Sequence, residues 1–114
     1  MYPQNTCLES DWKLFRKRVP VWQERYMGRL IEEYRAILES EESSSEKFWA
    51  LEKRIRQDKK SPGVIVDMRR STMRLELMQM LFQGVIQPSD LESFSQELRD
   101  GLTFVMQKYS GQGV

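Results

Sequence analysis

Histidine is absent from this 114-residue chain, and cysteine occurs once, at Cys7. Without histidine, the chain has no Ser-His or Cys-His nucleophile pair, and it lacks the commonest metal ligand and proton shuttle. A single cysteine excludes a thiolate zinc site and any disulfide within the chain. Neither GxxxxGK[ST] nor GxGxxG occurs, so the familiar phosphate-binding loops are missing. These absences predict a protein that is not an enzyme and that binds no cofactor or metal.

Long apolar runs are also absent, and none approaches the roughly 18 residues of a membrane-spanning helix. The first residues, MYPQNTCLESDW, have neither the basic start nor the apolar middle of a secretory signal. We therefore expect a cytoplasmic protein with no membrane contact. Hydrophobic residues make up 39% of the chain and charged residues 31%, which is typical of a charged globular domain. We expect one domain over 10–108, between a flexible arm at 1–9 and a frayed tail at 109–114.

Apolar residues at helical spacing are what the sequence does contain. The first set predicts one helix face with large side chains: Trp12, Phe15, Val19, Trp22 and Tyr26. Either Ser10 or Asp11 could cap the start of this helix. Pro20 interrupts the pattern, because a proline inside a helix costs about 3 kcal/mol. We expect a short helix near 11–18 and a long one from Pro20, with one continuous kinked helix as the alternative.

Three further helices follow in the sequence pattern. Ser43-x-x-Glu46 has the spacing of a capping box and predicts a helix over about 46–58, with Phe48, Leu51 and Ile55 on its apolar face. A helical pattern over 64–83 outweighs the three β-branched residues at its start and predicts a long third helix. Gly84 should close that helix in the left-handed conformation. A last helix is expected to begin at Pro88, with Ser89-x-x-Glu92 as a competing cap. The fold class is therefore all-α, a small four-helix bundle-like domain with the extra helix before Pro20 as an option.

The apolar band on the third predicted helix is wide, which indicates either a central helix or a helix shared with a partner. Methionine suits both settings, since it fills irregular cores and also lines adaptable binding surfaces. If the band is shared, the protein is expected to be a homodimer. The candidate interface residues are Met73, Leu77, Met78, Met80 and Leu81.

Basic residues concentrate in the middle of the chain. Residues 47–74 carry nine basic and three acidic side chains, a net charge of +6, whereas the whole chain has +1. A helix that starts at Gly63 or Val64 would offer unpaired amides to an anion, with these side chains nearby. A capped corner with solvated charges is the simpler interpretation. The candidate contacts for an anion or a nucleic acid are Lys53, Arg56, Lys59, Lys60, Arg69 and Arg70.

Three sequence runs resemble those of a group of short helical proteins from gut-dwelling Firmicutes. The runs are EKFWALEKRI at 46–55, DKKSPGVIV at 58–66 and MRRSTM at 68–73. The resemblance covers roughly residues 10–105 and implies a bacterial origin, but it carries no functional residues with it. Some members are labelled as multidrug transporters, and that label conflicts with the lack of a membrane span here.

The sequence therefore favours a small, non-enzymatic, cytoplasmic helical protein that acts through contacts with a protein partner or with itself. The alternative is an accessory protein that binds nucleic acid or another anion through the basic segment 47–74. The domain charge near zero and the lack of a basic arm speak against nucleic acid.

Overall fold

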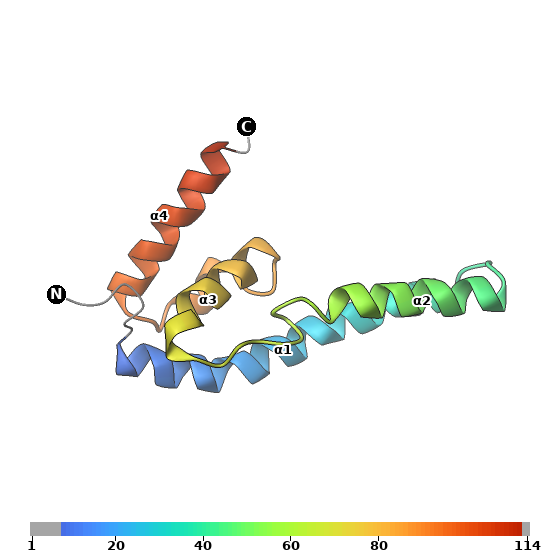
Figure 1. Cartoon of the computed structure of the whole chain (residues 1–114), viewed down its shortest axis with the longest axis horizontal. Coiled ribbons are helices and arrows are strands. Elements are labelled where there is room, and N and C mark those ends of the chain that lie inside the picture. Colours follow the sequence, from blue (N-terminus) through green and yellow to red (C-terminus); the bar gives the residue numbers. More distant parts are fainter. Residues whose placement is uncertain (1–7, 113–114) are drawn as a thin grey trace.

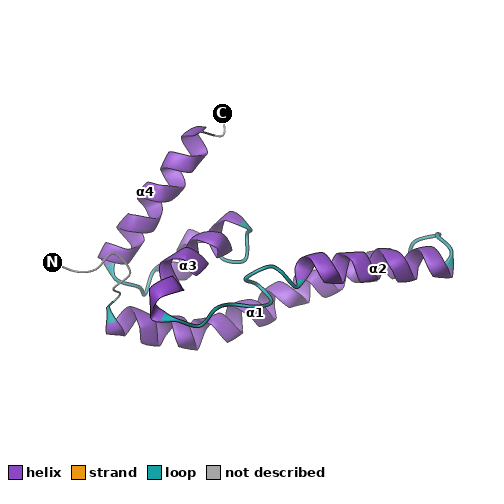
Figure 2. Ribbon diagram, in the orientation of Figure 1, coloured by secondary structure: helices purple, strands orange, loops and turns teal. Residues whose placement is uncertain are grey.

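The computed structural model describes residues 8–112, with side chains through residue 108. Within that range the chain forms four α-helices and two short 3-10 helices and contains no strand, so the all-α prediction is confirmed (Figure 2). The elements are α1 (Glu9–Leu38), α2 (Ser44–Asp58), η1 (Arg70–Thr72), α3 (Met73–Phe82), η2 (Pro88–Leu91) and α4 (Gln96–Gln112). Residues 1–7 of the predicted arm lie outside the described residues. The helix backbone continues through most of the predicted tail.

The molecule is elongated, with extents of 60 × 35 × 22 Å and a radius of gyration of 17.0 Å. A compact domain of this size would have a radius of gyration of about 13 Å. Figure 1 shows the reason, since the second half of α1 and all of α2 project as a hairpin from the rest of the protein. The first half of α1, α3 and the start of α4 meet at the other end. The core therefore occupies one end of the long axis.

The core joins the first half of α1 to the C-terminal half of the chain. Trp12 stacks on Phe15 with ring centroids 5.9 Å apart, and Trp22 stacks on Phe94 at 6.1 Å. These rings anchor the two ends of the α1 face, as its large apolar residues predicted. The buried cluster consists of Trp12, Phe15, Val19, Trp22, Met73, Leu77, Met80, Val85, Ile86, Leu91, Phe94, Leu98 and Leu102.

Helix α1 runs without interruption through Pro20, so the expectation of a separate helix over 11–18 was wrong and the continuous alternative is correct. Phe15, Val19 and Trp22 lie on both sides of the proline and are at most 2% exposed. Burial of each such side chain stabilises the fold by about 1.5–3 kcal/mol. Together these three outweigh the cost of about 3 kcal/mol for an interior proline. Pro20 itself faces solvent.

The predicted cap of α1 was also wrong, because the helix begins at Glu9 and Leu8 supplies no side-chain cap. Asp11 is instead buried within the first turn. Its carboxylate accepts hydrogen bonds from the Ser95 amide at 2.8 Å and from the Ser95 hydroxyl at 2.6 Å. The same hydroxyl oxygen accepts a bond from the amide of Leu98 at 3.2 Å, so Ser95 caps α4. Asp11 thus ties the start of the first helix to the start of the last.

The predicted helix over 64–83 is shorter than expected, since only Met73–Phe82 is α-helical. Gly63 packs on Tyr26 and Arg70 binds Glu9, two contacts about 26 Å apart along α1. The seven residue steps between Gly63 and Arg70 span about 23 Å when extended, but only about 10 Å as a helix. The linking segment is therefore non-helical, and its β-branched residues suit that conformation.

The end of α3 follows the prediction closely. Gly84 has φ +72°, the left-handed conformation that favours glycine. Its amide donates to the Leu81 carbonyl, and the Val85 amide donates to the Met80 carbonyl at 2.8 Å. Val85 and Met80 are both buried, which completes the hydrophobic contact of a Schellman motif.

Arginines of α1 hold this turn in place. Arg29 donates to the Gly84 carbonyl at 2.6 Å, and Arg25 donates to the Val85 carbonyl at 3.3 Å. Arg25 also binds Asp90 at 2.9 Å. Partial burial acts to raise the pKa of Asp90, but the hydrogen bonds from Arg25 and from the Gln87 amide bring that pKa below its usual value.

The last helix begins at Gln96, eight residues later than expected from Pro88. Pro88 instead opens the short helix η2, where Asp90 accepts a hydrogen bond from the Gln87 amide at 2.7 Å. The Ser89-x-x-Glu92 spacing therefore caps nothing in this part of the chain, and Ser95 performs that role for α4. None of the helices in the range 8–112 is both long enough and apolar enough to cross a membrane.

Two glycines of the hairpin give opposite predictions. Gly28 lies on an exposed face of α1, and a methyl group added there would meet no atom within 4 Å beyond its own stretch of helix, so Gly28→Ala should stabilise the protein by about 0.5–1 kcal/mol. Gly63 is packed against the Tyr26 ring, and an added methyl group there would overlap it. Gly63→Ala should destabilise the protein by about 1–3 kcal/mol. Thermal unfolding followed by circular dichroism measures both; equal effects of the two changes would contradict the packing at Gly63.

Candidate functional site

The projecting hairpin is held together by polar contacts between α1 and α2. Arg54 binds Glu33 at 2.5 Å, and the Tyr34 hydroxyl donates to Asp58 at 2.5 Å. The Arg54 guanidinium also lies over the Tyr34 ring, 5.6 Å from its centroid. Burial and the hydrogen bond to Asp58 raise the pKa of Tyr34 to about 12. The phenol is therefore neutral, and able to donate, throughout the physiological pH range.

The sequence Ser61-Pro62-Gly63 forms the base of the hairpin and is buried there. Gln23 donates to the Pro62 carbonyl at 3.2 Å, and the Gly63 amide donates to the Ser61 hydroxyl at 3.0 Å. The amides of Val64 and Ile65 both donate to the Ser61 carbonyl at 2.9 Å. Because no helix begins here and these amides have acceptors, the anion site predicted at Gly63 or Val64 lacks its helix N-terminus.

The six basic candidates divide into two groups. Lys53, Arg56, Lys59 and Lys60 are exposed on α2 or just after it. Arg56 pairs with Glu52 at 3.0 Å, one turn earlier. The other group, Arg69 and Arg70, follows the extended segment and lies near the start of α1. The Gly63–Tyr26 contact beside the first group and the Arg70–Glu9 contact of the second group lie about 26 Å apart along α1. The structure therefore does not assemble the six residues into one site.

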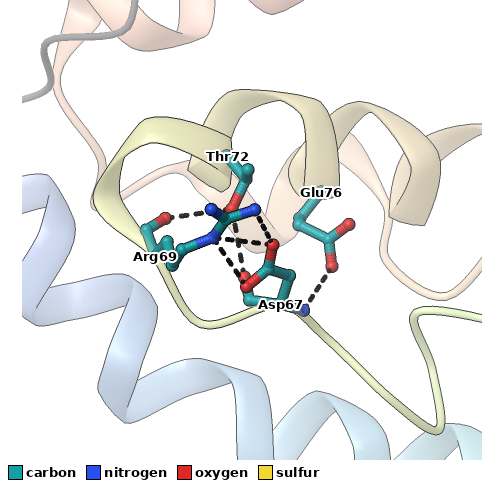
Figure 3. A network of polar contacts seen from close by, with 4 residues as sticks. All are labelled: Asp67, Arg69, Thr72 and Glu76. Atoms are coloured by element: carbon teal, nitrogen blue, oxygen red, sulfur yellow. Dashed lines mark hydrogen bonds and ion pairs between the residues drawn. The ribbon is translucent and has the colours of Figure 1, made fainter.

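Arg69 and Arg70 each bind a carboxylate. Arg70 donates to Glu9 at 2.7 Å and lies 5.3 Å from the centroid of the Trp12 ring. Figure 3 shows the surroundings of Arg69, whose guanidinium binds both oxygens of Asp67. The Thr72 hydroxyl donates to the Asp67 carbonyl at 3.2 Å, and the Asp67 amide donates to Glu76 at 3.1 Å. This network shapes the entry into α3, so Arg69 has a structural role, and Arg70 joins the same segment to the start of α1.

The predicted interface residues lie in or against the core. Met73, Leu77 and Met80 have 0% exposure, so as an interface they were predicted wrongly. Their side chains fill the space between α1 and α4 because α3 lies across the first half of α1. Met78 and Leu81 are partly buried and pack against the same cluster. Of the two interpretations of the wide apolar band, the central helix is the one that fits α3.

In contrast to these core residues, several large apolar residues of the projecting hairpin are exposed. Phe48 is 62% exposed and Trp49 is 63% exposed, and their rings meet edge to face at 5.0 Å. No residue of α2 is buried. Sequence periodicity grouped Phe48 with the apolar face of its helix, but periodicity alone does not show whether that face is covered. The clue was the narrowness of that stripe beside the many charges around it.

Two adjoining hollows make one continuous surface on the hairpin. A hollow of about 430 Å³ is lined by Phe48, Leu51, Glu52, Ile55, Arg56 and Lys59. A smaller hollow of about 200 Å³ is lined by Met27, Leu30, Ile31, Tyr34, Ile55, Asp58, Lys59 and Val64. The two hollows share Ile55 and Lys59, and Leu38 lies two turns beyond Ile31 on the same side of α1. We call this surface the hairpin face, made of Met27, Ile31, Tyr34, Leu38, Phe48, Leu51 and Ile55.

The residues that the structure describes contain no cluster of three or more carboxylate or thiol groups that could hold a metal ion. Comparison with protein-family models, with curated proteins and with solved structures found no match to this chain.

Proposed function

We propose that this protein acts through protein contacts made by its projecting hairpin, as a non-enzymatic cytoplasmic protein. The observation that carries the proposal is that α2 buries none of its residues although it presents Phe48, Trp49 and Ile55. Contiguous exposed apolar surface of this kind marks interaction sites on folded proteins. Tryptophan and tyrosine are also the side chains that most often anchor protein interfaces.

The energetics of α2 support the same proposal. Isolated helices below about 12–15 residues are marginal in water, and α2, with 15 residues, lies at that limit. It is supported by its Ser43 cap and by its contacts with α1, but the hairpin face stays in water. A partner that covers this face would remove its apolar side chains from solvent, at about 25 cal/mol per Å².

The alternative, binding of nucleic acid or another anion, has weaker support. Lys53, Arg56, Lys59 and Lys60 do line exposed positions on or beside α2. Arg69 and Arg70 lie at the other end of the linking segment and each binds a carboxylate. Of the remaining four basic residues, Arg56 and Lys59 line the same hollow as Phe48 and Leu51, a composition more typical of a protein interface with a charged rim.

The test removes the apolar side chains without disturbing the fold. The double change Phe48→Ser and Ile55→Ser should leave the melting temperature within a few degrees of the original, because these side chains lie at the surface. A photoreactive amino acid in place of Trp49 should form a protein adduct in cells that express the full chain, and the double change should abolish it. Comparison of adducts by gel mobility and mass spectrometry gives the readout.

The matched control places the same photoreactive group at Val21, which is 63% exposed on the core half of α1. No adduct is expected from that position. Equal adducts at both positions, or an adduct at 49 that survives the double change, would contradict the proposal. Unfolding of the double variant would instead assign Phe48 and Ile55 to the packing of the hairpin.

A further inference from the structure

The hairpin is a layer of two helices with one open apolar face. Helical layers become stable when another layer covers that face, and two pairs of helices form a four-helix bundle. The required partner is therefore a second helical pair with an apolar surface of similar length. The 15 residues of α2 make that surface about 22 Å long.

Charge varies in sign along this surface. The tip of the hairpin, residues 39–47, carries four glutamates and one lysine, a net charge of −3. The base of the hairpin, residues 53–60, carries five basic side chains and one aspartate, a net charge of +4. Arg56 and Lys59 of the base line the hollow that Phe48 and Leu51 also line. An ideal partner is thus positive opposite the tip and negative opposite the base.

We propose that the partner is a second copy of this chain, with the two hairpin faces packed against each other in antiparallel orientation about a two-fold axis near Leu51. This inference rests on the proposed function of the hairpin and names its partner. A second copy satisfies both charge requirements at once, because the acidic tip of each chain meets the basic base of the other.

Leu51 is the middle residue of α2, so we place the axis level with it. With the axis level with Leu51, Glu46 of one chain lies level with Arg56 of the other, five residues to either side. Glu42 lies level with Lys60, nine residues to either side. The two-fold axis produces each of these pairings twice. The apolar residues Phe48 and Ile55 fall between the charged ends, so they meet across the centre of the interface.

Two features of the hairpin support this orientation. Glu42 and Glu46 lie side by side, and their mutual hydrogen bond raises the pKa of Glu42 and lowers that of Glu46. Cations brought to this position would stabilise both carboxylates. Antiparallel packing also sets the N-terminus of each α2 beside the C-terminus of the other, which is favourable for the helix dipoles. Parallel packing would set tip against tip and base against base, with like charges opposed.

The test is an exchange of charge between two variants. One carries Glu41→Lys with Glu42→Lys at the tip, and the other carries Lys59→Glu with Lys60→Glu at the base. Each variant alone opposes like charges, so its dimer dissociation constant at low salt should rise by about tenfold or more. An equimolar mixture should recover the dimer, since both contacts of the mixed pair then join opposite charges. Light scattering coupled to size exclusion measures the mass, which for the original dimer is twice 13.6 kDa.

The control is the double change Lys13→Glu and Lys17→Glu, on the core half of α1, which should leave dimer formation unaltered. If a double variant unfolds, two single variants provide the same test when mixed, one with Glu42→Lys and the other with Lys60→Glu. A chain that stays monomeric at all concentrations overturns the inference, as does a mixture that fails to recover the dimer. If the Trp49 adduct then proves to be a different protein, and Phe48→Ser with Ile55→Ser abolishes it, the hairpin function stands without self-association.

Discussion

Leu77→Asp should unfold the protein. Leu77 has 0% exposure and lies at the centre of the cluster that joins α1, α3 and α4. Loss of its side chain removes about 2–5 kcal/mol through lost burial and a cavity. A carboxylate in its place has no partner there and adds a further penalty of several kcal/mol. The sum is comparable to the entire stability of a domain, about 5–15 kcal/mol.

The matched control for this prediction lies two residues away on the same helix. Leu75 is 50% exposed, so Leu75→Asp should change the stability by about 1 kcal/mol or less. Circular dichroism and urea unfolding compare the two variants directly. A folded monomer of Leu77→Asp would mean that α3 faces a partner rather than the core, and it would contradict the packing of α3 between α1 and α4.

Asp11→Ala should destabilise the protein by about 3 kcal/mol, because hydrogen bonds to a charged group contribute about 1.5–3 kcal/mol each and the two here share one acceptor group. Asp11 is 4% exposed and is bound by both the amide and the hydroxyl of Ser95. Its loss leaves these donors partly buried without their acceptor. It also frees the hydroxyl that caps α4, so the first turn of α4 should loosen.

Urea unfolding measures the change in stability, and hydrogen exchange at the amides of Ser95 and Leu98 measures the local effect. Asp11→Asn retains one acceptor oxygen and should cost less than Asp11→Ala. Asp100→Ala is the control, since its exposed carboxylate accepts one bond from Gln96 at 2.7 Å and should contribute about 0.5 kcal/mol or less. Equal losses for Asp11→Ala and Asp100→Ala would show that the link between α1 and α4 contributes no more than a surface contact.

Local signals in the sequence predicted local structure well. Ser43 accepts a hydrogen bond from the Glu46 amide at 3.3 Å, as its capping-box spacing indicated. The glycine at 84 adopts the left-handed conformation that was expected of it. Both features depend on residues within one or two turns of each other, so the neighbouring sequence is sufficient to determine them.

Features that depend on distant residues were missed. The continuity of α1 through Pro20 results from packing against residues more than fifty positions later. The extended segment before α3 results from the distance between two contacts on α1, which no local pattern records. Likewise, Asp11 is of a residue type that often caps helices, but its carboxylate instead accepts hydrogen bonds from Ser95, 84 residues later.

The candidate site shows the same division. Periodicity identified which residues share a helix face, both for Leu77 on α3 and for Phe48 on α2. It did not identify what covers each face, and the answers are opposite: Leu77 is fully buried and Phe48 is 62% exposed. Only the arrangement of the helices, with α2 beyond the end of the core, separates a core residue from a surface one.

The long sequence separation between Asp11 and Ser95 also predicts an order of folding during synthesis. The hairpin needs only residues up to about 64, so it is able to form while the ribosome is still adding the second half of the chain. The first half of α1 has no such local partner. Trp12, Phe15 and Trp22 pack against residues from Met73 onward, so we expect their burial to begin with α3 and to be complete only after α4 has emerged.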